Sequence, residues 1–252
     1  MIHYHGAPMS GNHQQFSRFY RGRHAMVSFA RRGQMPVIAE SCQSFALDNG
    51  AFSEWTKSGG PIDIPAYTEW VDEWRSHPGF DWCLIPDKIG GTVQENAKLI
   101  NDWMVHYANA WRVNSVPVWH LHEPIEWLEW LAGMYRTVAL GSSGQWRQPG
   151  TEPWWGRVNQ AMKAVCLNGR PRCRIHGLRM LDPAIFSRLP FASADSTNAA
   201  MNAGATSRFG SYPPPEAWQR ATVIADRIEA FNSSPAWVER QETQLMLWEA
   251  LA

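Results

Sequence analysis

The chain alternates short apolar segments with longer segments that carry apolar residues at helical spacing. The short segments have the composition of buried strands and stop at glycine, proline or polar residues. Eight of them can be recognised, at 2–7, 25–30, 45–52, 82–87, 116–122, 137–140, 174–180 and 191–195. Strands that alternate with helices form parallel sheets. Eight such strands in 252 residues favour a closed barrel over an open doubly wound sheet.

The segments between the strands show helix signals of several kinds. Apolar residues recur at helical spacing over 67–74, 154–165 and 218–231, and Thr92 with Glu95 has the spacing of a capping box at the start of a helix that reaches Trp111. Ser234 and Pro235 are expected to open a last helix. We therefore predict an α/β fold, a (β/α)8 TIM-like barrel at 1–210, with a C-terminal helical extension at 211–252 packed on the barrel.

Charge and composition exclude several classes of protein. The 23 basic and 23 acidic residues balance, so the whole chain has no basic character of the kind that marks nucleic-acid binding. With 44% hydrophobic and 18% charged residues, the composition is globular. No apolar run is long enough to span a membrane and the N-terminus lacks a signal pattern, so we expect a soluble, cytoplasmic protein. The cysteines show no CxxC pair and are expected to be free thiols; they are Cys42, Cys83, Cys166 and Cys173.

Arginines are nevertheless concentrated in two regions. They could form a local phosphate-binding patch or simply a solvated face. The candidate nucleic-acid contacts are Arg18, Arg21, Arg23, Arg31 and Arg32, interleaved with aromatic residues, and Arg179 in the second region.

Polar residues follow several of the predicted strands, and barrel chemistry takes place at that end of the strands. Three of them are the carboxylates Asp48, Asp87 and Asp195. Two neighbouring carboxylates can serve as nucleophile and general acid or base when their surroundings separate their pKa values. The alternative for Asp195 is that it only caps the following helix.

Several of these strand ends resemble one enzyme superfamily. Segment 47–52, Leu-Asp-Asn-Gly-Ala-Phe, resembles the Asp-Ser-Gly-Gly-Phe motif of the queuine tRNA-ribosyltransferase (tRNA-guanine transglycosylase) superfamily. Segment 193–196 resembles the site of that family's nucleophilic aspartate, and 141–144 its Gly-rich loop. Asp87 resembles, by its place in the sequence, the base-binding aspartate of that family. Segment 120–123 falls where the family has a strand end that carries glycine and glutamine. The compact size and the form of 48–52 resemble most the DpdA-type branch of phages and bacteria, which inserts a 7-deazaguanine into DNA.

The resemblance implies roles for individual residues. Asp195 would be the nucleophile, Asp48 would handle protons on the two bases, and Asp87 would accept hydrogen bonds from guanine. The remaining implied base contacts are Asn49, Gly50, Phe52, His120, His122, Gly141, Ser142, Ser143 and Met180. The implied partners are DNA and a 7-deazaguanine base, and no cofactor is implied.

One departure from the family bears on the substrate. The tRNA enzymes have a Cys-x-Cys-x-x-Cys and histidine zinc site, which this sequence lacks; Cys166, Cys173 and His176 supply at most a partial set. We therefore expect no zinc subdomain and no metal, and DNA rather than tRNA as the substrate.

Two other functions are compatible with the sequence. The first is a metal-dependent hydrolase of the amidohydrolase type, with a ligand set drawn from His3, His5, His120, His122, His176 and Asp195. The second is a barrel that binds nucleic acid through its arginines and aromatic residues without catalysis.

Overall fold

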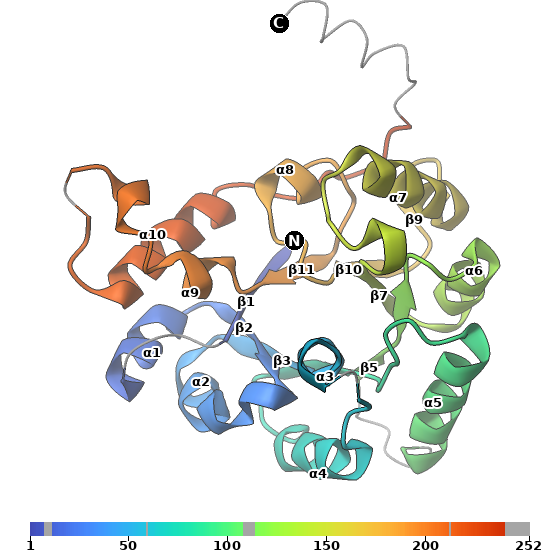
Figure 1. Ribbon diagram of the computed structural model, residues 1–252, viewed down its shortest axis with the longest axis horizontal. Coiled ribbons are helices and arrows are strands. Elements are labelled where there is room, and N and C mark those ends of the chain that lie inside the picture. The colour runs from blue at the N-terminus through green and yellow to red at the C-terminus, as the bar shows by residue number, and fades with distance from the viewer. Residues whose placement is uncertain (8–11, 59, 108–113, 212, 240–252) are drawn as a thin grey trace, which may run out of the picture.

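The computed structural model describes residues 1–7, 12–58, 60–107, 114–211 and 213–239. Parallel strands form a ring, and helices surround it (Figure 1). The strands of the ring are β1 Ile2–Gly6, β2 His24–Ser28, β3 Ser44–Asp48, β4 Phe80–Leu84, β5 Ser115–Val116, β6 Val118–His120, β7 Thr137–Gly141, β10 Arg174–Gly177 and β11 Ser193–Ser196. The predicted α/β barrel is thereby confirmed.

The ring closes through an interrupted strand. Hydrogen bonds run in the order β5-β4-β3-β2-β1-β11-β10-β7-β6, so β5 and β6 are the two ends of the sheet. These two ends follow each other directly in the sequence and are separated by Pro117, which has no N–H to donate. The Pro117 carbonyl still accepts a hydrogen bond from Ala139 N at 2.9 Å. The fifth predicted strand is therefore two short strands, each paired with a different neighbour.

Several helices begin where the sequence signals place them, although the helix expected to reach Trp111 ends at His106. Thr92 and Glu95 form the predicted capping box of α5, and Pro65 lies in the first turn of α4. The α-helices are α1 His13–Tyr20, α2 Met35–Ser41, α3 Ala51–Ser58, α4 Ile64–Trp74, α5 Val93–His106, α6 Ile125–Met134, α7 Glu152–Val165, α8 Pro183–Phe186, α9 Asn198–Asn202 and α10 Ala217–Glu229. Short 3-10 helices are η1 Phe29–Gln34, η2 Gly144–Trp146 and η3 Thr206–Phe209.

Helix α3 has an unusual place for a barrel helix. In Figure 1 it lies inside the ring of outer helices, over the carboxyl ends of the strands. The expected strand at 45–52 ends at Asp48, because Gly50 adopts a φ of 80° and turns the chain directly into α3. The Asp-Asn-Gly-Ala-Phe segment is consequently a strand end followed by the first turn of a helix.

Alternation along the strands separates two layers of core. Phe45 and Leu47 of β3 face the outer helices, whereas Ala46 faces the barrel interior. The interior is filled by Tyr4, Met26, Ala46, Trp82, Leu84, Val116, Val118 and Ala139. Side chains therefore fill the barrel interior, and they leave space only beyond it, where the strands end.

The last part of the chain differs from the prediction. Helix α10 packs against α1 and α9 on the outside of the barrel, but residues 230–239 form no helix. The last predicted helix is thus absent from 234–239, and its continuation through Trp248 lies outside the described residues. Residue Trp237 is held by a backbone hydrogen bond from its N–H to the Gly169 carbonyl at 2.7 Å. Gly169 belongs to a short hairpin of β8 Cys166–Leu167 and β9 Arg170–Pro171, which the sequence did not predict.

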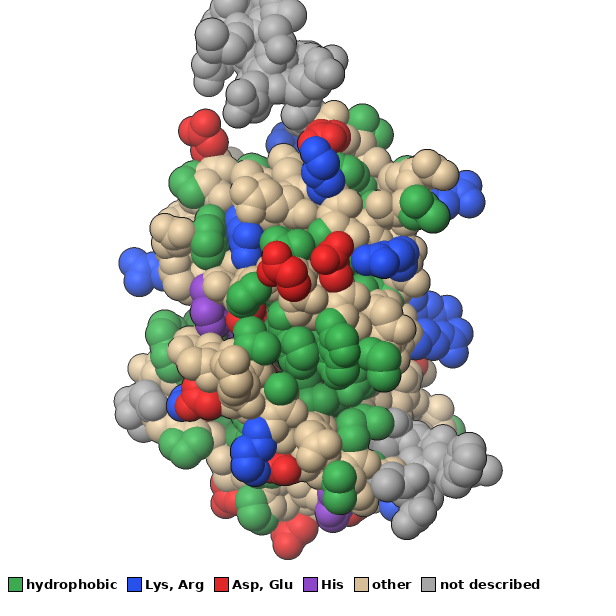
Figure 2. All heavy atoms as spheres, turned by 90° about the vertical axis from the view of Figure 1, so that its right-hand side faces the viewer, with side chains coloured by type: hydrophobic (Ala, Val, Ile, Leu, Met, Phe, Trp, Pro, Cys, Tyr) green, Lys and Arg blue, Asp and Glu red, His purple; other side chains and the backbone are tan. Residues whose placement is uncertain are grey.

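The outside of the barrel carries an apolar patch. Figure 2 shows hydrophobic side chains gathered on the face around α6, where Trp130 and Met134 are exposed. This patch is on the flank of the barrel and does not line the cavity at its mouth. In the described part of the chain, no helix is long and apolar enough to cross a membrane.

Candidate active site

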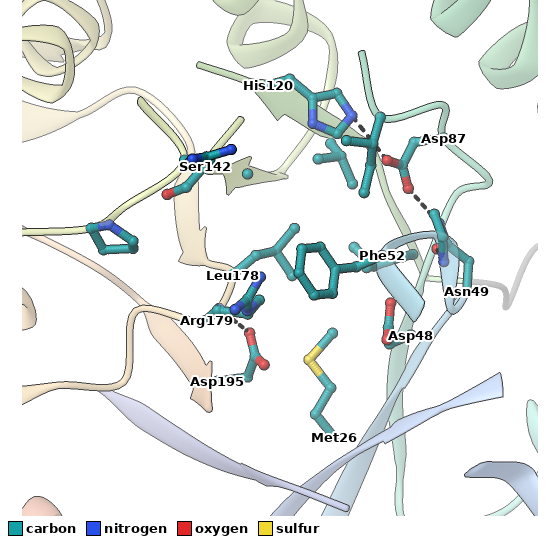
Figure 3. A pocket seen from close by; sticks show the side chains of 17 residues that line it. Met26, Asp48, Asn49, Phe52, Asp87, His120, Ser142, Leu178, Arg179 and Asp195 are labelled. Atoms are coloured by element: carbon teal, nitrogen blue, oxygen red, sulfur yellow. Dashed lines mark hydrogen bonds and ion pairs between the residues drawn. The ribbon is translucent and has the colours of Figure 1, made fainter. Parts of the chain in front are cut away.

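A cavity of about 150 Å³ opens where the strands end, at the side of the barrel that α3 covers. Chemistry in barrels of this kind is located at this end, because loops from every strand converge there. Figure 3 shows polar side chains from opposite sides of the ring pointing toward it. Its lining includes Met26, Asp48, Asn49, Phe52, Leu84, Asp87, Ile89, Val118, His120, Gly141, Ser142, Arg147, Pro149, Leu178, Arg179 and Asp195.

Asp48 is a carboxylate whose pKa is strongly altered by its surroundings. Burial raises its pKa to about 7, and the negative charges of Asp195 and Asp87 act in the same direction. A hydrogen bond from Gly50 N to Oδ1, at 3.3 Å, opposes this effect and lowers the pKa. Asp48 can therefore gain or lose a proton near neutral pH, as a general acid or base must.

Asp195 is held in a different way. It lies in β11, is 8% exposed, and its Oδ1 accepts hydrogen bonds from Arg179 N at 2.8 Å and from His176 Nε2 at 3.3 Å. Arg179 has a φ of 60°, so the chain takes a left-handed turn directly after the N–H that donates to the carboxylate. The helix-capping interpretation is wrong, because Thr197 is the N-cap of α9 and, among the residues that the structure describes, Asp195 makes no hydrogen bond to that helix.

Asp87 is fixed by partners on both sides. Its Oδ1 accepts a hydrogen bond from Asn49 Nδ2 at 2.6 Å, and its Oδ2 is in ion-pair contact with His120 Nε2 at 2.9 Å. Burial alone would lower the pKa of His120, but contact with Asp87 and the charge of Glu123 outweigh burial and raise it. The contact with Asp87 thus favours the protonated form of His120.

His120 depends on further buried groups for its position. Glu123 accepts hydrogen bonds from His120 N at 2.8 Å and from Asn96 Nδ2 at 2.9 Å. On the other side, a Cβ on Gly141 would lie only 3.1 Å from His120 Nδ1. Glycine at 141 therefore leaves room for the imidazole, which gives this residue of the predicted Gly-rich loop a physical role.

An aromatic side chain and a guanidinium group lie across the cavity. Phe52, from the first turn of α3, is 39% exposed and projects between Asp48 and Asp195 (Figure 3). The Arg179 guanidinium carbon lies 3.9 Å from the centroid of the Phe52 ring, which is a cation–π contact. These two side chains form the cover of the cavity.

Not all predicted base contacts reach the cavity. Asp87, Asn49, Phe52, His120, Gly141 and Ser142 line it, whereas Gly50, His122, Ser143 and Met180 do not. Met180 is fully buried in the core between the strands and the outer helices. The left-handed turn at Arg179 redirects the chain after β10, so Met180 does not continue the alternation of that strand.

The side chains of His122 and Ser143 contact each other beside the cavity. The Ser143 hydroxyl is 2.7 Å from His122 Nδ1, and His122 Nε2 is 3.0 Å from the Gly91 carbonyl. These contacts join the loops that carry Gly91, His122 and Ser143, and the two side chains do not face the interior. Gly50, at the turn before α3, borders a second cavity behind that helix.

The predicted arginines are divided between the two ends of the barrel. Arg31 and Arg32 follow β2 and lie at the mouth with Arg179. Arg21 and Arg23 precede β2 and therefore lie at the opposite end, where Arg23 forms ion pairs with α10. Arg18, on the outer helix α1, stacks on Trp218 at 5.4 Å. The six arginines therefore do not form one patch.

Some lining residues were not predicted. Arg147 and Pro149 come from the loop after β7, and Leu178 from the end of β10. Leu178 was recognisable, since it comes two residues after the inward-facing His176 and alternation therefore places both side chains on the same face. Arg147 lies six residues beyond its strand, where alternation gives no information.

The ligand set of a metal-dependent hydrolase is not assembled. His3 and His5 point to the outside of the barrel, where His3 Nε2 is 3.0 Å from the Phe231 carbonyl and His5 Nε2 is 2.7 Å from Glu229 Oε1. Among the described residues, no group of three histidine, cysteine or acidic side chains is placed to hold a metal ion. Because His3 and His5 point away from the barrel interior, the structure gives the hydrolase interpretation no support.

Comparisons with known proteins agree on the fold. No protein-family model matches the sequence, and no curated protein matches it. Among solved structures, the YdjI aldolase from Escherichia coli is similar at a TM-score of 0.54 and 10% identity, over 92% of each chain. The tryptophan synthase alpha-subunit from Pyrococcus furiosus is similar at a TM-score of 0.53 and 11% identity, over 92% of this chain and 98% of that one. At such low identity these likenesses show a TIM barrel and nothing about the reaction.

Proposed function

We propose that this protein is a DNA-guanine transglycosylase, which exchanges guanine in DNA for a 7-deazaguanine base such as 7-cyano-7-deazaguanine. The observation that carries the proposal is a pair of carboxylates in one cavity with contrasting surroundings. Asp195 accepts two N–H donors, while burial raises the pKa of Asp48 to about 7. Such a pair provides a nucleophile and an acid–base group for double displacement at a glycosidic carbon.

In the first half of the reaction, Asp195 attacks C1′ of a deoxyguanosine. The C1′–N9 bond breaks, its electron pair leaves with guanine, and protonated Asp48 supplies a proton to the departing base. The N–H donors of Arg179 and His176 keep the Asp195 carboxylate in place for in-line attack. A covalent deoxyribosyl ester of Asp195 results.

In the second half, the incoming 7-deazaguanine replaces guanine in the cavity. Ionised Asp48 removes the proton from N9, N9 attacks C1′, and the ester bond breaks to regenerate the Asp195 carboxylate. One group thus acts first as an acid and then as a base, and a pKa of about 7 suits both roles.

Asp87 is the proposed reader of the purine edge. A carboxylate can accept hydrogen bonds from N1–H and the exocyclic amino group of guanine, which are both donors. Asn49 and His120 each contact one oxygen of Asp87, and each oxygen has a further lone pair that can accept from a base. Pre-organised partners of this kind lower the entropic cost of binding.

A base in duplex DNA can reach these groups only after it is flipped out of the stack. The exposed ring of Phe52 provides a stacking surface for it. Arg179 and Arg147, which both line the cavity, provide positive charge for the phosphates that flank the flipped nucleotide.

The test is incubation of the purified protein with DNA and 7-cyano-7-deazaguanine, followed by digestion and mass spectrometry of the nucleosides. We expect the modified deoxynucleoside to accumulate with the wild type and not with Asp195→Asn. A parallel incubation with tRNA distinguishes the two nucleic acids. Tight DNA binding without any exchange would instead favour a non-catalytic barrel.

A further inference from the structure

A buried histidine lies directly beneath the proposed nucleophile. His176, in β10, is 0% exposed and faces the barrel interior, and it has no part in recognising a base in the proposal above. In the sheet it is paired with Ser193 of β11, two residues before Asp195. The adjacent strands therefore bring three polar side chains together inside the barrel.

The two ring nitrogens of His176 have different partners. Nδ1 is 2.8 Å from the Ser193 hydroxyl, and Nε2 is 3.3 Å from Asp195 Oδ1. The carboxylate oxygen can only accept, so Nε2 carries the proton. A hydroxyl can donate, so in the neutral ring Ser193 donates to Nδ1. Ser193 thus selects the tautomer that donates to the carboxylate.

Aromatic packing fixes the plane of the imidazole. The Trp82 ring meets it edge-on with centroids 4.8 Å apart, and Tyr4 does so at 6.0 Å. Trp82 is itself held, because its indole N–H donates to the Tyr4 hydroxyl at 3.1 Å. Tyr4 in turn donates to Asp81 at 2.7 Å. The histidine therefore cannot turn away from Asp195 without disturbing the barrel interior.

The donors to Asp195 converge on one oxygen. Both Arg179 N and His176 Nε2 donate to Oδ1, and within the described residues no hydrogen bond reaches Oδ2. Oδ1 is directed at the protein and Oδ2 is the oxygen left for a substrate. The carboxylate is thus oriented with one defined atom facing outward.

From this geometry we infer that His176 is a positioning residue, oriented by Ser193, which fixes Asp195 so that Oδ2 is the nucleophilic atom. The inference rests on the proposed function. Oδ2 forms the bond to C1′ as the C1′–N9 bond breaks, and Oδ1 becomes the ester carbonyl while keeping its donors. When the ester breaks, the electron pair of the C1′–Oδ2 bond returns to the carboxylate, whose charge the same donors stabilise.

The kinetic test compares His176→Phe with His176→Gln. Phenylalanine keeps the ring volume but removes the donor, whereas the glutamine amide can donate where Nε2 does. We expect His176→Phe to lower kcat about 10- to 100-fold with little change in the KM for the base, as loss of a hydrogen bond to a charged group predicts. His176→Gln is expected to recover most of kcat. A purely structural role would give no such rescue.

The matched control is His5→Gln. His5 is also buried and also contacts a carboxylate, Glu229, but on the outer face of β1. We expect this variant to keep the wild-type kcat. A folded His176→Phe that keeps wild-type kcat, or a loss of kcat in His5→Gln equal to that in His176→Phe, would overturn the inference.

A spectroscopic test separates the inference from the proposed function and from folding. ¹⁵N NMR of the wild-type imidazoles should show His176 with Nε2 protonated, and Asp195→Asn should shift the Nε2–H resonance. Ser193→Ala should shift the Nδ1 resonance. A wild type that shows this signature but no base exchange contradicts the proposed function alone. A His176 protonated only at Nδ1 contradicts the positioning role, even if His176→Phe does not fold.

Discussion

His120 Nε2 lies 2.9 Å from Asp87 Oδ2, and the two residues come from neighbouring segments of the barrel mouth. The pair is joined to the start of α3 by Asn49, whose side chain donates to Asp87 Oδ1. Asn49, Asp87 and His120 therefore form one cluster that connects the cavity lining to the start of the helix that covers the cavity. The side chains proposed to recognise a base are thus held in place by contacts with that helix start.

Removing the Asp48 carboxyl should change how stability depends on pH. Because burial raises the Asp48 pKa from 3.8 to about 7, the folded chain holds more protons than the unfolded chain between about pH 4 and 7. Stability contributed by this group therefore falls as the pH rises through that window. We expect Asp48→Asn to lose less stability than the wild type between pH 5 and 8, by at most about 3 kcal/mol at about 1.4 kcal/mol per pKa unit. Urea denaturation at both pH values measures this, and equal losses would contradict the pKa assignment.

The same group should impose opposite pH trends on the two half-reactions. Release of guanine needs protonated Asp48, so its single-turnover rate should fall as the pH rises above about 7. Attack by the incoming base needs ionised Asp48, so its rate should fall as the pH drops below about 7. Rapid-quench assays with labelled guanine and labelled 7-deazaguanine measure the steps separately. Two parallel profiles would argue against one group serving both.

Gly141→Ala tests the fit of His120. The added Cβ would lie 3.1 Å from His120 Nδ1 and 3.2 Å from Val118 Cγ1, so one of these side chains must move. We expect a higher KM for the base together with a loss of stability of about 1–3 kcal/mol, typical of overpacking. Gly156→Ala in α7 is the control, since nothing lies within 4 Å of a Cβ there. An unchanged KM in Gly141→Ala would show that the position of His120 does not affect base binding.

Phe52→Ala should weaken binding of the flipped base. Stacking on an aromatic side chain contributes about 1–3 kcal/mol per base, so KM should rise about 5- to 150-fold. Phe52→Tyr retains the ring and should restore most of the affinity. If alanine and tyrosine variants behaved alike, Phe52 would be a cover for the cavity without stacking on the base.

Arginines at the two ends of the barrel should differ in their effect on DNA binding. Removing a phosphate contact lowers the salt dependence of the binding constant by about one unit of slope. We expect this for Arg147→Ala, at the cavity rim, and not for Arg23→Ala. Arg23 pairs with Asp226 and Glu229 of α10, so its loss should lower the melting temperature instead. Fluorescence anisotropy over a salt series distinguishes the two variants.

The strand–helix alternation was sufficient to predict the barrel, because periodicity and capping are local properties of the chain. The break of the fifth strand at Pro117 was not predicted, since only the completed ring shows that its two halves pair with different neighbours. Helix α3 was missed for a different reason. Segment 45–52 is apolar enough to be predicted as one strand. In the structure the left-handed turn at Gly50 ends the strand and starts α3.

Within the site, strand ends were easier to predict than loops. Asp48, Asp87 and Asp195 meet at one cavity, as parallel strands require. Met180 was misplaced because one left-handed residue, Arg179, redirects the chain after β10. The support of Asp195 by His176 could not be predicted either, because it depends on which residues of two adjacent strands are in register.

The most direct test of the account is identification of the covalent intermediate. Wild-type protein incubated with a guanine-containing DNA duplex and no incoming base, then quenched in acid and digested, should yield one peptide carrying a deoxyribosyl adduct. We expect mass spectrometry to place this adduct on Asp195 and Asp195→Asn to form none. An adduct on another residue, or base exchange by Asp195→Asn at the wild-type rate, would contradict this expectation.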